Sequence, residues 1–228
     1  WCIQFNKDLA TDMQIPNLYE LVNEGKWTLD KLTEYCTAVA NLNGDNDFTW
    51  NKDGNAFYGI SAHFSGITNK LLYGAGCRYV ETQDNGDILF TLDNDHFYTV
   101  IDKLGRLMDP QAGLMLEGHT TDFDADLGGY MYAFTALRTM FLTAEIKAAQ
   151  LMRDMEDTFG LVPMPKADES QEDYYTTIVN TMFYWAIPTT NTKLDMTATI
   201  SEVLTHESYE KVVPVYYNSV VEHKGLRN

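Results

Sequence analysis

The residues best suited to contact a small molecule are His63, Phe64 and Ser65, which follow the apolar run 57–60 and precede a predicted helix over 67–73. An imidazole, an aromatic face and a hydroxyl together offer hydrogen bonds and a stacking surface. In open α/β sheets, ligands bind at loops that leave the carboxyl end of a strand and enter a helix. The pattern therefore predicts non-covalent ligand binding here, although an ordinary exposed or capped loop histidine would explain His63 equally well.

Two other stretches carry several oxygen ligands. In the polar loop 41–53 the order of residues departs from a calcium-binding loop, because Asn41 replaces the first Asp, Asn46 replaces the turn Gly and Lys52 replaces the bidentate acid. A second stretch has three alternating aspartates, Asp122, Asp124 and Asp126. We therefore predict a solvated loop over 41–53, with a calcium site as the less favoured alternative. The three aspartates could bind a cation, but alternating acids in such a loop are usually solvated.

The cysteines Cys2, Cys36 and Cys77 are isolated in the sequence and their number is odd. No CxxC pair and no Cys/His spacing typical of a metal site is present. We therefore expect three free, buried thiols rather than a disulfide framework.

Composition and motifs argue against an enzyme. The chain lacks a nucleophile elbow, an HExxH motif, a GxGxxG loop and a P-loop, and its 33 acidic residues make chance carboxylate pairs inevitable. We expect no catalytic residues and no cofactor. The net charge of −17 should repel nucleic acid, and no apolar run approaches the ~18 residues that span a bilayer.

The stretch 134–166 predicts a strand, an amphipathic helix and a second strand. Residues 138–142 and 159–162 form short apolar runs, and the apolar residues between 144 and 155 recur at helical spacing. Such a βαβ unit implies a parallel sheet.

The remaining elements follow from local signals. Thr28 is a predicted N-cap for an amphipathic helix that starts at Leu29, and Asn85-Gly86 between two apolar runs predicts a hairpin. A helix should start at Asn94 or Asp95, and two helices are expected over 194–204 and 209–221. The 45% apolar content is typical of a folded domain.

Five motifs, in order along the chain, resemble those of the extracellular solute-binding proteins that serve bacterial ABC importers. They are residues 5–9 (FNKDL), 25–32 (GKWTLDKL), 58–60 (YGI), 159–166 (FGLVPMPK) and 185–188 (WAIP). The resemblance implies an α/β lobe like that of periplasmic binding proteins, with a mainly parallel sheet flanked by helices. Trp27, within the second motif, is expected to be a packing residue rather than a ligand platform.

The resemblance also implies a division of the chain. Residues 1–8 would be a crossover strand from a first lobe, residues 9–185 the second lobe, and residues 186–228 helices returning to an incomplete first lobe. The chain opens at Trp1 without the basic and apolar regions of a signal peptide, so we expect an excised fragment of a longer exported protein.

By the same resemblance, seven residues are expected to bind the solute: His63, Phe64, Ser65, Thr143, Glu145, Tyr184 and Trp185. Helix-dipole pairing would explain Glu145 equally well, and strand packing would explain Trp185.

The function implied is the capture of a small solute, most readily a mono- or oligosaccharide, for delivery to a membrane permease. The protein would be a monomer and either periplasmic or extracellular, lipid-anchored at the cell surface in its full-length form. Two alternatives remain open: a cell-surface adhesion module that kept a binding-protein lobe and, less favoured, a carbohydrate-active enzyme.

Overall fold

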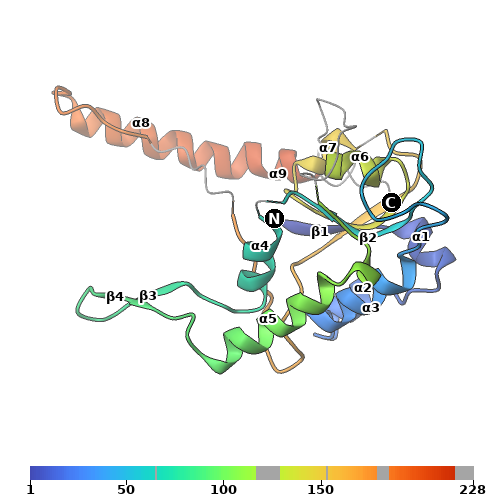
Figure 1. The fold of residues 1–228 in the computed structure, drawn as a ribbon. Helices are drawn as coiled ribbons and strands as arrows, with labels where there is room; N and C mark the ends of the chain where they lie inside the picture. Colours follow the sequence, from blue (N-terminus) through green and yellow to red (C-terminus); the bar gives the residue numbers. More distant parts are fainter. Residues whose placement is uncertain (65, 117–128, 153, 179–184, 219–228) are drawn as a thin grey trace.

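The computed structural model describes residues 1–64, 66–116, 129–152, 154–178 and 185–218. Its centre is a five-stranded sheet with the strand order β5-β2-β6-β1-β7. Figure 1 shows this sheet at the strands labelled β1 and β2. The strands are β1 (Cys2–Asn6), β2 (Tyr58–Ala62), β5 (Leu114–Leu116), β6 (Thr139–Ala144) and β7 (Phe159–Val162). β2 pairs in parallel with β5 and β6, whereas β1 pairs antiparallel with β6 and β7. The predicted mainly parallel sheet is confirmed, with β1 as its one reversed strand.

The strand β1 lies between the two strands of the predicted βαβ unit. β6 and β7 run in the same direction, but each pairs with β1 and not with the other. All five residues of β1 are buried, as expected for a central strand. Gly160 of β7 lies opposite Phe5 of β1, and a Cβ at this position would collide with the Phe5 ring. The glycine thus permits the close packing of this pair.

The helix between β6 and β7 is much shorter than predicted. Among the residues described between these two strands, only α7 (Ala148–Leu151) is helical, with four residues. Ala148, Met152 and Met155 are nevertheless buried, because they pack with Leu142 of β6 and Phe159 of β7. The apolar spacing correctly predicted which residues are buried. It did not predict the backbone conformation, because these residues are buried without a long helix.

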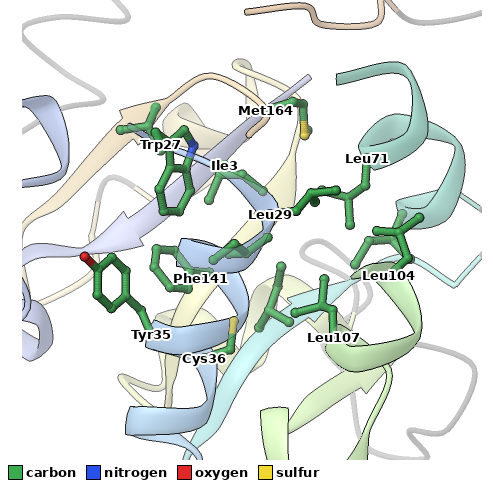
Figure 2. Packing of buried hydrophobic residues seen from close by; sticks show 14 of the residues in the cluster. Ile3, Trp27, Leu29, Tyr35, Cys36, Leu71, Leu104, Leu107, Phe141 and Met164 are labelled. Atoms are coloured by element: carbon green, nitrogen blue, oxygen red, sulfur yellow. The ribbon is translucent and has the colours of Figure 1, made fainter. Parts of the chain in front are cut away.

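One face of the sheet carries the larger core. It is covered by α3 (Leu29–Val39), α4 (Ile67–Gly74) and α5 (Asp95–Leu107), with the short helices α1 (Lys7–Asp12) and α2 (Leu18–Asn23) alongside. Thr28 caps α3, since its hydroxyl accepts a hydrogen bond from the Lys31 amide, as predicted. Trp27 and Phe141 lie together at the centre of this core (Figure 2).

The opposite face is covered by α6 (Gly129–Thr135) and α7. Phe134 of α6 packs with Leu142 and Phe159, and Ala133 packs with Trp50 and Tyr58 in a second cluster. The sheet is therefore buried between two layers of helices, as in other three-layer α/β folds.

Two parts of the chain project from this body (Figure 1). The predicted hairpin is confirmed as β3 (Val80–Thr82) paired antiparallel with β4 (Ile88–Phe90), and all six of its strand residues are exposed. The other projection is α8 (Leu194–Glu207), none of whose residues is buried.

The two helices expected near the C-terminal end join into one helical stretch. α8 continues through a π-helical turn (Ser208–Val212) into α9 (Val213–Val215), which contains Pro214. Proline removes a backbone donor, and the wider π turn just before it accommodates that loss. The end predicted at Val221 lies outside the described residues. No helix in the described ranges has the length and apolar character needed to cross a membrane.

All three cysteines are free and buried, as predicted. Burial raises the pKa of the Cys2 thiol from 9.0 to about 11, and burial also raises the pKa of Cys36. A raised thiol pKa means that the folded chain keeps a proton that the unfolded chain releases.

The consequence is a loss of stability in alkali. The contribution of Cys2 to the free energy of unfolding is fully present below pH 9 and should be lost as the pH rises through about 11. The loss should lower the free energy of unfolding by roughly 2–3 kcal/mol. Urea unfolding of the wild type and of Cys2→Ala between neutral pH and pH 11 measures this, because the difference between their pH slopes isolates Cys2. Parallel slopes, or rapid thiol modification of the folded chain near pH 8, would contradict it.

Candidate functional site

The carboxyl ends of the parallel strands meet at one edge of the sheet. The register aligns Ala62 of β2 with Thr143 of β6, and Cys2 of β1 with Ala144 of β6. His63, Glu145 and Trp1 are the residues next to these strand ends, so they emerge at the same edge. We call this edge, with Trp1, His63, Phe64, Lys70 and Glu145, the carboxyl edge. It is the position where open α/β sheets bind ligands.

Aromatic rings gather at the carboxyl edge. The His63 and Phe64 rings are stacked, with centroids 4.9 Å apart and planes inclined by 23°. The ring of Tyr130, from α6, meets His63 edge to face at 5.8 Å. Phe64 is 59% exposed, which is unusual for a phenylalanine and leaves an open aromatic face. The Ser61 hydroxyl donates to the Tyr130 carbonyl at 2.8 Å and so ties α6 to β2.

Charged groups flank these rings. The Lys70 ammonium, on α4, lies 3.2 Å from the centre of the Trp1 ring, a cation–π contact. Burial lowers the pKa of Lys70, and the Glu145 carboxylate opposes that shift. Glu145 also forms an ion pair with Lys147 at 2.8 Å. The carboxyl edge therefore combines aromatic faces with a hydrogen-bond donor, Lys70, and an acceptor, Glu145. Such a combination can bind a polar ring compound.

The structure brings together three of the seven residues expected to bind a solute: His63, Phe64 and Glu145. Thr143 belongs to the same strand end, but its side chain is buried and its hydroxyl has no hydrogen-bond partner among the described residues. Trp185 is 79% exposed and lines a groove with α8, described below. Ser65 and Tyr184 lie outside the described residues.

Three members of the site were missed by the sequence reasoning: Trp1, Lys70 and Tyr130. Each comes from a different part of the chain, and no motif links them to the loop at His63. Only the strand order, with β1 reversed and next to β6, brings Trp1 to this edge. Of the three, only Lys70 could have been predicted from the sequence, because it lies one turn into the helix that follows the His63 loop.

The loop 41–53 does not form a cluster of metal ligands. The Asp45 carboxylate instead accepts hydrogen bonds from the amides of Asn55 and Ala56, each at 2.8 Å. Within the described part of the chain, no three His, Cys, Asp or Glu side chains are grouped to hold an ion. Asp122, Asp124 and Asp126 lie outside the described residues.

A groove of about 890 Å³ lies between the extended segment 185–191 and α8. Its apolar walls include Trp185, Ile187, Ile200 and Leu204, all of them exposed. A helix that buries none of its own residues has no core partner in the described chain.

The fold resembles several solved structures. An ABC substrate-binding protein from Listeria monocytogenes in complex with cycloalternan is 12% identical, matches 70% of this chain and 35% of its own, and gives a TM-score of 0.45. Maltose-bound MalE3 from T. maritima is 17% identical over 73% of this chain and 38% of its own, with a TM-score of 0.47. UgpB from Mycobacterium tuberculosis in complex with glycerophosphocholine is 11% identical over 72% and 36%, with a TM-score of 0.47.

The chain thus spans little more than a third of the length of these three structures. No protein-family model matches the sequence, and no curated protein matches it. Similarity of this extent does not by itself assign the chain to a family or give it a ligand.

Proposed function

We propose that the carboxyl edge is one wall of a cleft that binds a small polar solute, most readily a carbohydrate. One observation carries this proposal: the stacked pair of His63 and Phe64, with an open Phe64 face, lies at the carboxyl end of the parallel strands. Aromatic faces suit the apolar faces of sugar rings, and Lys70 and Glu145 suit their hydroxyl groups. The ligands in two of the similar structures, cycloalternan and maltose, are carbohydrates. Binding without bond making or breaking accounts for every residue that this edge contributes.

The division of the chain is part of the proposal. Residues 1–8 cross from a first lobe, residues 9–185 form the second lobe, and residues 186–228 return to the first. The reversed direction of β1 supports this division, because a strand that enters from another lobe need not follow the direction of the βα succession. The unburied apolar residues of α8 support it too, since they would pack against the rest of the first lobe.

The division predicts opposite outcomes for charges placed in two helices. Ile200→Asp in α8 should change the free energy of unfolding of this chain by no more than about 0.5 kcal/mol, because Ile200 is already exposed. Leu32→Asp in α3, which buries a charge in the core, should prevent stable folding. Urea unfolding followed by circular dichroism compares the two. A large loss from Ile200→Asp would mean that α8 is already packed in this chain.

The whole protein would deliver its solute to the membrane permease of an ABC importer. It would act as a monomer outside the cytoplasm, either free in the periplasm or lipid-anchored at the cell surface. Closure of two lobes around the solute would present the closed form to the permease. This chain alone would hold its solute weakly, because it supplies only one wall.

A second candidate function is adhesion. The β3–β4 hairpin favours it, because Ile88 and Phe90 are 72% and 65% exposed on a two-stranded ribbon that projects from the body. Large exposed apolar side chains on such a projection are typical of contact surfaces between proteins. An adhesion module would bind a macromolecule through the hairpin and leave the carboxyl edge without a solute.

A thermal-shift screen of mono- and oligosaccharides tests the proposed function. It is run on this chain and on the longer, two-lobed protein that the proposed division requires. A sugar should raise the melting temperature of the two-lobed protein and leave that of this chain almost unchanged, because stabilisation grows with the ratio of ligand concentration to dissociation constant. If no sugar stabilises either protein, the carbohydrate class is wrong.

A further inference from the structure

The side chain of Arg138 contacts several residues of the loop 41–56. Arg138 lies between the end of α6 and the start of β6, and its side chain is 13% exposed. Its Nε donates to the Ala56 carbonyl and its Nη1 to the Asn51 carbonyl, each at 2.9 Å. Its Nη2 is 3.8 Å from Oδ2 of Asp45. Two carbonyl oxygens of the loop therefore accept hydrogen bonds from the guanidinium group, and the Asp45 carboxylate lies at ion-pair distance from Nη2, which has no hydrogen-bond partner among the described residues.

The same oxygens are of the kinds that a calcium loop offers to its ion. Calcium takes carboxylate and backbone carbonyl oxygens from a short acidic loop. Here the Asp45 carboxylate also accepts two backbone amides, so the loop closes around Asp45 and Arg138 together. An arginine is permanently charged, and its planar fork directs several donors at once. The side chain thus supplies the positive charge that a metal ion would otherwise supply.

Two aromatic rings complete the surroundings of the guanidinium. Its Cζ lies 4.7 Å from the ring centre of Trp50 and 5.6 Å from that of Tyr58. Trp50 belongs to the loop and is 2% exposed. Its ring packs edge to face on Tyr132 of α6, with centroids 5.5 Å apart. The guanidinium therefore fixes a tryptophan that supports α6.

The helix α6 in turn carries Tyr130, which reaches the carboxyl edge. Tyr130 and Ala133 pack in the same cluster as Trp50 and Tyr58. The Tyr130 ring contacts His63, which is stacked on Phe64. A continuous set of contacts thus runs from Arg138 through Trp50 and α6 to the proposed binding face.

We propose that Arg138 is a built-in cation that organises the loop 41–56 without metal, and that it is a positioning residue for the Tyr130–His63 contact. The consequence for solute binding rests on the proposed function, whereas the effect on His63 geometry does not. Arg138 itself touches no solute in this account. It acts through Trp50 and α6.

The test is an NMR measurement of the His63 ring in the 228-residue chain. Histidine is labelled at the ring carbons, His63 is assigned from His63→Gln, and His96, which bonds the Ala75 carbonyl, is the internal reference. The variants are Arg138→Met, which removes the charge, and Arg138→Lys, which keeps it. The matched control is Arg106→Met, since Arg106 is an exposed arginine in an ion pair with Asp30. Millimolar Ca²⁺ and a chelator are added to the wild type in a parallel melting experiment.

Arg138→Met should move the His63 signal several-fold more than the His96 signal, Arg138→Lys should move it less, and Arg106→Met should move neither. The melting temperature of the wild type should respond to neither Ca²⁺ nor the chelator. Loss of stability with an unmoved His63 signal would reduce Arg138 to a structural role and overturn the positioning claim. Stabilisation of the wild type by Ca²⁺ would contradict the claim that Arg138 organises the loop without metal.

Two further results separate a failure of the Arg138 proposal from a failure of the proposed solute binding. If Arg138→Met does not fold, the shift in Arg138→Lys decides, with an unmoved His63 signal as the contradicting result. If the wild type binds no solute, the His63 signal still reports the positioning contact, so the two failures can be told apart.

Discussion

Replacing Trp27 with alanine should lower the free energy of unfolding by about 3–5 kcal/mol, a large part of the roughly 5–15 kcal/mol that stabilises an ordinary protein. Trp27 is fully buried, its indole Nε1 donates to the Pro163 carbonyl at 2.9 Å, and its ring lies 5.7 Å from that of Phe141. The substitution would leave a large cavity between α3 and the sheet and a carbonyl without its donor. The expected packing role of Trp27 is confirmed by this burial.

Urea unfolding measures the effect, with Trp185→Ala as the matched control. Trp185 is 79% exposed, so its loss should cost no more than about 0.5 kcal/mol. Equal losses from the two substitutions would contradict the account of the core. A Trp27→Ala chain with full stability would show that the surrounding side chains can refill the space.

Replacing Phe64 with alanine should weaken binding of a carbohydrate by about tenfold or more, corresponding to about 1.4 kcal/mol or more. Phe64 presents its exposed face at the carboxyl edge, and its other face is stacked on His63. Because the side chain is mostly in solvent, the free energy of unfolding should change little. The dissociation constant is measured by NMR titration at millimolar sugar, where a single wall of a cleft still gives a signal.

The matched control is Phe90→Ala on the hairpin, a phenylalanine of similar exposure at 65%. It should leave sugar binding unchanged. Weaker binding in Phe90→Ala with unchanged binding in Phe64→Ala would move the binding surface to the hairpin and favour adhesion.

Local signals predicted much of the fold. The Thr28 cap of α3 and the Asn85-Gly86 hairpin depend on interactions within a few residues, and both are confirmed. The long helix before β7 was wrong because burial of Ala148 and Met152 in the core does not require helical continuity. Apolar spacing records which residues are buried, and tertiary packing decides how the backbone gets them there.

The candidate site was predictable only in part, for a related reason. His63 and Phe64 follow a strand directly, so the strand-to-helix rule locates them. Trp1 and Tyr130 reach the same edge only because β1 is inserted beside β6 and because α6 packs on the loop around Trp50. Strand order and loop packing depend on contacts between residues far apart in the chain, which no local pattern encodes.

The most direct test of the proposed binding edge is an NMR titration of the 228-residue chain with linear glucose oligosaccharides, read at the ring signals of His63 and Phe64. We expect saturable shifts of both signals at millimolar sugar, with the signals of the exposed hairpin residue Phe90 unmoved. Shifts confined to the hairpin, or no shifts at any sugar concentration, would contradict a carbohydrate-binding wall at the carboxyl edge.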